Sequence, residues 1–245
     1  MGIDFLVIGF VLASLGYILA GSIPIAAIGI DTAILGALIL LIVPEPVPHD
    51  AYKALLSDSI SNIEIILEES HLEERAYFIL TDEKQVRAFV PAIVAQGRAH
   101  PISTSSSQLE LVESLSKSPA RFVTRSGDQL GLLLVPPGNE IVRLSKVQQG
   151  DDLEESLRSS IVNFSELASS VMAVEQQEGG KSLVKINISN PKLSSAFPFF
   201  NRCLGSPLSC IASCVVVALK GKAARLVDEK IEGKLVHATL EIIES

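Results

Sequence analysis

The first part of the chain is a nearly continuous apolar run from Ile3 to Val43, interrupted at Gly21-Ser22-Ile23-Pro24. The interruption divides the run into Ile3–Ala20, with 18 residues, and Ile23–Val43, with 21. A helix needs about 20 mostly apolar residues to span a bilayer, and at least about 17. Backbone groups in lipid must form hydrogen bonds within the segment, so both runs are expected to be helices. The pattern predicts a transmembrane helical hairpin over residues 1–48.

Turn residues mark the ends of the two predicted helices. Gly21 and Ser22 end the first helix, and Pro24 suits the first turn of the second. Three prolines within Val43–Pro48 end the second helix and extend the chain into water. Because the turn is short, the helices are expected to run antiparallel, with Met1 and the rest of the chain on one side of the bilayer.

Three other interpretations compete with a membrane-spanning hairpin. A cleaved signal peptide has a basic segment before its apolar run, whereas residues 1–43 contain no Lys or Arg. N-myristoylation requires Ser or Thr at the sixth position, where Leu6 stands. A hairpin in water would need a partner to cover roughly 40 mostly apolar residues. The two-span interpretation is therefore favoured.

Small residues recur at helical spacing in both apolar runs. They are Gly9, Ala13 and Gly16 in the first run and Gly29, Ala33 and Gly36 in the second. Small side chains let helix backbones approach closely in a membrane. Packing within the hairpin and packing between copies of the chain are both consistent with this pattern.

Asp31 is the unusual residue of the second apolar run. An ionisable group inside a span is costly, and by default it is a functional candidate. It could lie near the interface, cap a helix that begins at Thr32, or form a hydrogen bond to Ser14, Tyr17 or a sister chain. A structural or assembly role is favoured over proton handling, because no other ionisable residue lines up with it.

The orientation follows from the basic residues that flank the spans. The turn has no Lys or Arg, whereas Lys53 lies beyond the second span, opposed by Asp50 and Asp58. The positive-inside rule therefore places the N-terminus and the soluble domain in the cytoplasm. The expected location is the cell membrane with two passes, and the lipid bilayer is the first expected partner.

Residues 49–150 read as an α/β subdomain with two β-hairpins. Apolar residues at three- and four-residue spacing predict an amphipathic helix over 50–69. The first hairpin pairs Arg75–Leu80 with Gln85–Val90, and the second pairs Ala120–Arg125 with Gln129–Val135. A Ser-rich loop over 96–106 and a short helix over 108–117 lie between them. The order helix, hairpin, helix, hairpin suggests an internal duplication.

Residues 151–245 read as a second α/β subdomain, after a boundary at Gln149-Gly150. An apolar stripe predicts a long helix from Asp151 to about Gln176, ended by Glu178-Gly179-Gly180. A strand over Lys181–Ser189 and a Phe-rich loop come next. The chain then forms a core helix over Leu208–Leu219, capped by Ser206, and two strands, Ala223–Glu229 and Lys234–Ile243. The expected fold class is a mixed α/β (α+β) soluble domain behind the hairpin.

Charge excludes one class of partner. From His49 onward the chain has 25 acidic and 20 basic residues, a net charge of −5, without a strongly basic stripe. Non-specific nucleic-acid binding is therefore not expected, nor is electrostatic docking to anionic lipid headgroups. No cofactor is predicted.

The cysteines fall within one short segment, at Cys203, Cys210 and Cys214. Together with His237, if the sheet brings it near, they are candidate ligands for a metal or a small molecule. The spacing lacks the CxxC pair that is typical of metal sites. Small buried cysteines in a core helix are the favoured interpretation, and the clustering fits the cytoplasm.

Other motifs carry weaker signals. Gly179-Gly180-Lys181-Ser182 resembles the end of a phosphate-binding loop, but Glu175 stands where its first Gly is required. His100 in the Ser-rich loop could act with Ser103 or Ser105, although such pairs arise easily by chance. Gly205-Ser206-Pro207 opens the core helix, where free amides could bind an anion, and ordinary capping is the favoured interpretation.

The arrangement resembles a family of uncharacterised archaeal membrane proteins. The resemblance rests on the apolar hairpin, the exit Val43-Pro44-Glu45-Pro46-Val47-Pro48 and the helix opening Leu204-Gly205-Ser206-Pro207. It covers most of the chain and implies no activity. The last 95 residues also resemble small-molecule-binding domains of the vinyl reductase type, but the Cys and Glu pattern of those domains is not matched, so no ligand residues are carried over.

These patterns lead to an expected function that is not enzymatic. The chain is expected to be a binding or scaffold module at the cytoplasmic face of the membrane, with a protein partner or self-association. One alternative is a small-molecule or metal sensor that uses the Cys203–Cys214 segment. A second is a membrane-tethered hydrolase or transferase around His100.

Overall fold

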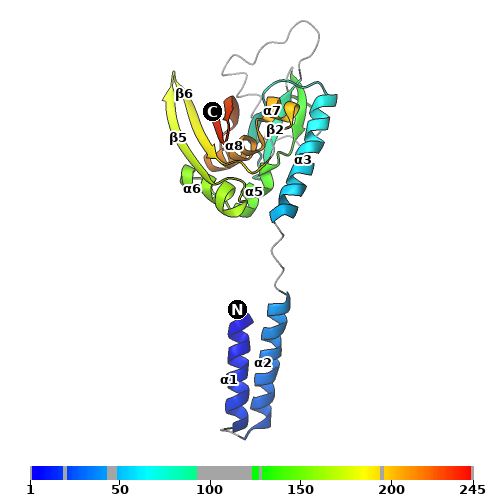
Figure 1. The fold of residues 1–245 in the computed structure, drawn as a ribbon, viewed down its shortest axis with the longest axis vertical. Helices are drawn as coiled ribbons and strands as arrows, with labels where there is room; N and C mark the ends of the chain where they lie inside the picture. Colours follow the sequence, from blue (N-terminus) through cyan, green and yellow to red (C-terminus); the bar gives the residue numbers. More distant parts are fainter. Residues whose placement is uncertain are drawn as a thin grey trace. The chain divides into compact units, whose positions relative to one another are not determined.

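The computed structural model describes residues 2–18, 21–42, 49–92, 123–126, 129–193 and 196–243. The chain divides into two compact units, Met1–Pro48 and His49–Ser245 (Figure 1). The first boundary coincides with the predicted end of the apolar hairpin. The predicted boundary at Gly150 lies inside the second unit, so residues 49–245 are described together below.

The first unit is a pair of helices. They are α1 (Gly2–Ile18) and α2 (Ile23–Ile42), which lie side by side in Figure 1. Gly21 adopts a φ of 55° between them, a left-handed conformation that glycine accepts without strain. The amide of Ser22 donates to the Gly16 carbonyl at 3.0 Å and closes the turn.

The second unit is built on one antiparallel sheet of eight described strands, in the order β3-β4-β2-β1-β7-β8-β6-β5. The mixed α+β class predicted for this part of the chain is confirmed. The strands are β1 (Tyr77–Leu80), β2 (Val86–Pro91), β3 (Val123–Ser126), β4 (Gln129–Leu134), β5 (Ser170–Glu178), β6 (Lys181–Ser189), β7 (Ala224–Glu232) and β8 (Leu235–Ile242).

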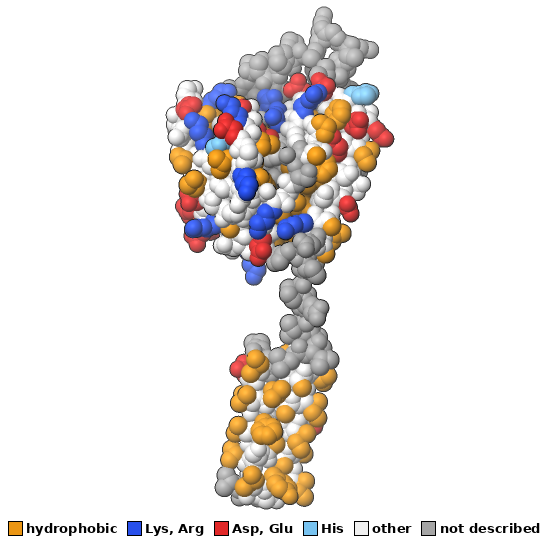
Figure 2. Space-filling model, in the orientation of Figure 1, with side chains coloured by type: hydrophobic (Ala, Val, Ile, Leu, Met, Phe, Trp, Pro, Cys, Tyr) orange, Lys and Arg blue, Asp and Glu red, His pale blue; other side chains and the backbone are white. Residues whose placement is uncertain are grey.

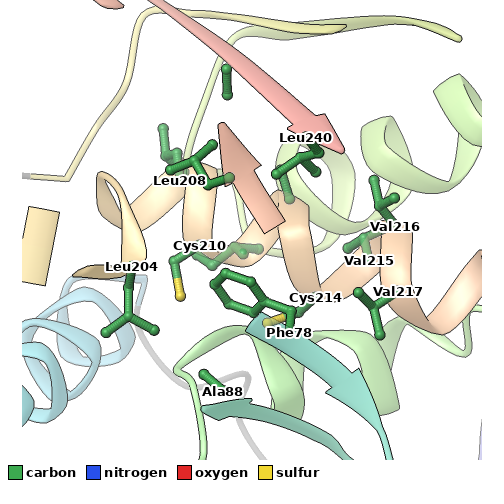
Figure 3. Packing of buried hydrophobic residues seen from close by; sticks show 14 of the residues in the cluster. Phe78, Ala88, Leu204, Leu208, Cys210, Cys214, Val215, Val216, Val217 and Leu240 are labelled. Carbon is green, nitrogen blue, oxygen red and sulfur yellow. The ribbon is translucent and has the colours of Figure 1, made fainter. Parts of the chain in front are cut away.

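Helices pack on one face of this sheet. They are α3 (His49–Glu69), α5 (Gly138–Ser145), α6 (Leu153–Leu157), the π-helix η1 (Arg158–Phe164), α7 (Pro198–Leu204) and α8 (Pro207–Lys220). The buried residues of these helices share one apolar core with alternate residues of the strands. Its centre is α8, which is buried from Pro207 to Leu219 and contacts β1, β2, β7 and β8. Figure 3 shows Phe78 of β1 beside Cys214 of this helix.

The strand order repeats across the sheet. Each half holds two hairpins, β1-β2 with β3-β4 and β5-β6 with β7-β8. In each half the second strands of the two hairpins pair, β2 with β4 and β6 with β8. The halves join through β1 and β7, where Tyr77 pairs with Arg225 and Phe78 with Ala224. The two halves therefore share one strand order. This repeat differs from the duplication suggested by the sequence, which concerned the two hairpins within residues 49–150.

The opposite face of the sheet differs between the halves. In the first half it carries a second buried apolar cluster of Tyr77, Ile79, Phe89 and Leu133, which is completed at the junction by Ala223, just before β7, and Ile243, just after β8. In the second half the same face carries polar or exposed residues, such as Met172, Lys185 and His237. Strands that are buried on both faces read as continuous apolar runs, which is the pattern of Ala76–Leu80 and Ala88–Val90.

The long helix predicted from Asp151 to Gln176 is wrong. Only α6 and η1 are helical, and Ser170–Glu178 is the strand β5. The residues Gly179 and Gly180 form the tight turn of the β5-β6 hairpin, with φ values of 60° and 80°. Two adjacent residues with positive φ match the right-handed twist of a hairpin, and this favours glycine at both positions.

Two short helices were not predicted. The chain after Pro136-Pro137 continues as α5, and the segment read as a Phe-rich loop contains α7. The predictions of α3, of both hairpins in the first half and of β6, α8, β7 and β8 are confirmed. The predicted loop over 96–106 and helix over 108–117 lie outside the described residues.

One described stretch, Pro198–Lys220, is long and apolar enough to cross a membrane by length and composition. Its apolar window is 94% buried inside the second unit, and Gly205 separates it into α7 and α8. It is therefore the core of this unit. In the first unit, the described apolar stretches Ile3–Ile18 and Ile23–Ile39 fall short of the same length criterion.

Candidate functional site

The small residues of the hairpin lie where α1 meets α2. Gly9, Gly16 and Gly29 are buried, and so is Gly36, while Ala13 and Ala33 are half-buried. A Cβ on Gly9 would lie 2.7 Å from the carbonyl oxygen of Gly29. A Cβ on Gly16 would lie 2.8 Å from the amide nitrogen of Ala26. The small faces are therefore used within the hairpin, because any larger side chain would push the helices apart.

Large apolar side chains cover the outside of the same hairpin (Figure 2). Phe10 is 70% exposed on α1 and Ile34 is 53% exposed on α2. Further exposed residues include Ile3, Val7, Ile8, Val11, Leu15, Ile18, Ile23, Ile28, Ile30, Leu35 and Leu38. This distribution is the reverse of a helix pair in water, where large apolar residues face inward.

Asp31 lies on the outside of the hairpin and near the middle of α2. It follows Ile23 by 8 residues and precedes Ile42 by 11, about 12 Å and 16 Å along the helix axis. The proposed cap of a helix that begins at Thr32 is wrong, because α2 already begins at Ile23. The hydroxyl of Ser14 donates to the Phe10 carbonyl instead, at 2.8 Å.

The thiols of the second unit are all buried. Cys210 and Cys214 lie one turn apart on α8 (Figure 3). Cys203 lies near the end of α7. Burial raises the pKa of Cys203 to about 12, and its thiol donates to the Leu72 carbonyl at 3.2 Å. Burial also raises the pKa of Cys210, and contact with the Cys214 thiol adds to this. A protonated thiol is a poor nucleophile and a poor metal ligand.

His237 does not join the cysteines. It alternates along β8 with Val236 and Ala238, which are buried on the side of α8, so its ring lies on the opposite face of the sheet. There its Nδ1 lies 2.6 Å from the Oδ1 of Asn187 on β6. Across the residues that the structure describes, no group of three His, Cys, Asp or Glu side chains could hold a metal ion.

Carboxylates from distant elements occupy the N-termini of α8 and α7. Both oxygens of Glu229 on β7 accept from the Ser206 amide, at 2.9 and 3.0 Å. Glu64 on α3 accepts from the amides of Phe199 and Phe200, the first at 3.0 Å. The free amides of a helix start attract an anion. In this fold the anion at the Gly205-Ser206-Pro207 opening is the protein's own Glu229.

A cleft of about 710 Å³ opens between α6, η1 and β5. Its lining consists of Asp152, Leu153, Glu154, Glu155, Arg158, Ser159, Asn163, Ala173 and Glu175. Lys220 donates a hydrogen bond to Glu175 and, with the hydroxyl of Ser182, holds the pKa of this carboxyl below its usual range. A lining dominated by carboxylates favours positively charged groups over anions.

The π-helix beside the cleft is held by serine hydroxyls. The amide of Ser165 donates to the Ser160 carbonyl five residues earlier at 3.2 Å, and its hydroxyl donates to the same oxygen at 2.8 Å. The hydroxyl of Ser160 lies 2.9 Å from that of Ser145 on α5. Single π-turns are frequent at functional sites. Sequence reasoning missed this cleft because it read the whole segment as one regular helix.

The predicted pairing of His100 with Ser103 or Ser105 lies outside the described residues. The role of Glu64 and Glu229 at helix N-termini was also not predicted, because each residue meets the helix that it binds only after the chain has folded. A glutamate on a strand carries no local signal for a helix that begins more than twenty residues away.

Comparison with known proteins adds no relative. No protein family matches this chain, no curated protein resembles it significantly, and no solved structure shares its fold significantly. The resemblance to an uncharacterised archaeal membrane family therefore stays a prediction.

Proposed function

We propose that this chain is a membrane-anchored binding module, with the hairpin as a two-pass anchor and the α+β unit at the cytoplasmic face. The observation that carries the proposal is the inverted distribution of residue sizes in the hairpin. Glycines such as Gly9 and Gly29 fill the contact between the helices, while Phe10 and Ile34 point outward. Lipid tails replace the missing apolar core, because they solvate large side chains while small residues let the helices pack.

The length of the helices supports the same proposal. The backbone of α2 is helical for 20 residues, about 30 Å, which is about the thickness of a bilayer's hydrocarbon core. The 17 residues of α1 lie at the lower limit for a span. Lys and Arg are absent from residues 1–43, so no basic group would need to enter the lipid.

Binding, rather than catalysis, is supported by the state of the predicted site residues that the structure describes. The three thiols are buried, and the pKa of Cys203 is raised to about 12. The Nδ1 of His237 forms a hydrogen bond with the Oδ1 of Asn187. The cleft beside η1 offers a concave surface of about 710 Å³, within the range of ligand sites, although its polar lining suits a charged partner better than an apolar one.

Membrane fractionation tests the anchor. The full-length chain is expected to stay in the membrane pellet after an alkaline carbonate wash. Ile34→Lys places a charge on the outer face of α2 and is expected to lower the membrane fraction, since a lysine at the centre of a span costs about 3 kcal/mol of insertion free energy. Leu55→Lys is the matched control, because Leu55 is 67% exposed on α3 in the other unit. Release of the unmodified chain by carbonate would refute the anchor.

Thiol labelling tests the orientation. The native cysteines are buried, so they give little background in the folded protein. Ser22→Cys reports on the turn of the hairpin, and Asp82→Cys reports on the exposed turn between β1 and β2. A membrane-impermeant maleimide is expected to label the first variant in intact cells and the second only after permeabilisation. The opposite pattern would place the α+β unit outside.

A further inference from the structure

We propose that the face of α2 that carries Asp31 is an assembly surface, and that a second copy of this chain covers it inside the membrane. The inference rests on the proposed membrane anchor. It assigns a partner to the hairpin: two copies related by a two-fold axis along the membrane normal, with their Asp31 carboxyl groups in contact.

Asp31 lies too deep in the proposed span for its carboxyl group to reach water. Its Cα lies about 12 Å along the axis from the start of α2 and about 16 Å from the end, so it sits close to the middle of the span. An aspartate side chain is too short to bridge such a distance, unlike the long stems of Lys and Arg that reach the interface. A carboxyl at this depth needs a polar partner or a water-filled surrounding.

The hairpin itself cannot supply that partner. At about 100° per residue, Asp31 lies about 200° around α2 from Gly29, which packs against α1. The Asp31 side chain is therefore exposed on the side away from α1. Within the part of the chain that the structure describes, Asp31 has neither a hydrogen bond nor an ion pair. The neighbouring hydroxyl of Thr32 donates to the Ile28 carbonyl at 2.7 Å.

The same face allows close approach by another helix. Ala27, one turn before Asp31, is exposed and lies about 160° from Gly29 around α2, so it shares the outer face. A small residue next to a polar one is the combination that permits helix contact and hydrogen bonding in lipid. Leu38 continues this face towards the end of α2 and is 49% exposed.

A second copy meets these requirements without any further group. A two-fold axis along the membrane normal places both Asp31 residues at the same depth, and such isologous dimers are the commonest assemblies. Two carboxyl groups can form a hydrogen bond to each other when at least one holds a proton, because the protonated group donates and the other accepts. A different protein would need its own polar group at this depth. The apolar run of this chain contains no Lys, Arg or His that could serve.

Cysteine cross-linking in membranes tests the contact. Leu38→Cys lies on the Asp31 face, and Ile3→Cys is the matched control at the same end of the hairpin, 65% exposed on α1. Oxidation with copper–phenanthroline is expected to link Leu38→Cys into a species of twice the chain mass, while Ile3→Cys stays largely monomeric. Equal cross-linking of the two variants would overturn the proposal.

Substitution of Asp31 tests the role of the carboxyl. Asp31→Leu in the Leu38→Cys background is expected to weaken dimerisation roughly 3- to 30-fold, the measured range for one hydrogen bond between membrane helices. Asp31→Asn is expected to retain the dimer, because its amide both donates and accepts. Leucine is a good helix former on a lipid-facing surface, so the first variant is expected to remain folded and in the membrane.

The outcomes separate this proposal from the anchor. An unmodified chain that leaves the membrane pellet would defeat the anchor itself. A chain that stays in the pellet but whose cross-linking is unchanged in Asp31→Leu would defeat only the Asp31 contact. Cross-linking of Leu38→Cys to a protein of another mass would replace the second copy by a different partner.

Discussion

Single carboxylates connect distant parts of the second unit by binding helix N-termini. Glu229 reaches from β7 to the amide of Ser206, and Glu64 reaches from α3 to the start of α7. Each of these hydrogen bonds places a negatively charged carboxylate at the positive end of a helix dipole, where it is stabilising. The side chain of Ser206 also accepts from the Ser209 amide. Two backbone amides at the start of α8, those of Ser206 and Ser209, therefore have side-chain acceptors.

Removal of the Glu229 carboxylate is expected to destabilise the fold. Glu229→Ala leaves the Ser206 amide without its charged acceptor, and a loss of about 1–3 kcal/mol in the free energy of unfolding follows. Urea denaturation measures it. Glu232→Ala, at an exposed site on the same strand, is the control and is expected to change stability by less than about 0.5 kcal/mol. Equal effects in both variants would mean that the cap is not important.

The Cys203 thiol is expected to make stability fall at alkaline pH. Its pKa is raised from 9.0 to about 12 by burial, so between these values the unfolded chain releases a proton that the folded chain keeps. The folded state then binds more protons, and stability decreases as pH rises through this window. Between pH 8 and 10.5 this one group accounts for a loss of about 2 kcal/mol.

Cys203→Ala isolates this contribution. Urea denaturation at pH 8 and at pH 10.5 is expected to show a pH-dependent loss about 2 kcal/mol smaller in the variant than in the unmodified chain. The buried Cys210 titrates in the same direction and is common to both proteins. An identical loss in the two proteins would mean that the Cys203 thiol ionises normally in the folded state.

At the level of elements, the segment 151–178 shows where periodicity misleads. Leu153, Leu157 and Ile161 are spaced as on a helix, and they do belong to α6 and η1. Val171 fits the same helical spacing only by coincidence. It belongs to the strand β5, and its side chain is buried there. The two glycines that end β5 suit a hairpin turn as well as a helix end. Only the partner strand β6 decides between these readings.

The β5-β6 turn gives a test of this correction. Gly180→Ala places a Cβ at a φ of 80°, and a loss of about 1 kcal/mol is expected from backbone strain. Gly179→Asn is expected to be nearly neutral, because Asn-Gly is a preferred pair in such turns. Thermal unfolding compares the two variants. A larger effect of the asparagine would contradict the hairpin geometry.

Much of the fold could be predicted because its signals are local. The Ser206 cap and the apolar run that follows it identify α8, and alternation identifies β6 and β8. The start of α5 at Gly138 has no such signal. This glycine is required by tertiary contact, since a Cβ there would lie 2.8 Å from the Cα of Ile211.

The candidate site could be predicted only where it depends on local spacing. The small residues of the hairpin were found because helical spacing alone places them on one face. The position of His237 on the face away from the cysteines depends on the register of β8. The cleft depends on the packing of η1 against β5, which no single segment encodes.

At the scale of the whole molecule, the second unit joins its two halves through a short strand contact, through α8, and through the helix contacts α3–α7 and α5–η1. The β1-β7 register is only Tyr77–Arg225 and Phe78–Ala224, so strand pairing alone holds the halves weakly. The buried helix α8 contacts strands of both halves, β1 and β2 on one side of the junction and β7 and β8 on the other. Side chains of α8 therefore contact both halves at once.

Ile211→Ala is expected to weaken both halves together. Ile211 is fully buried on α8, and its truncation is expected to cost about 2–5 kcal/mol. Hydrogen exchange of the full-length protein should show the same loss of protection in β2 and in β6, because both strands open with the unit as a whole. Ile65→Ala, at a site on α3 that is 49% exposed, is the control and is expected to leave both strands protected. A loss confined to one half would mean that the halves open separately, and the boundary at Gly150 would then separate two folding units that share a sheet.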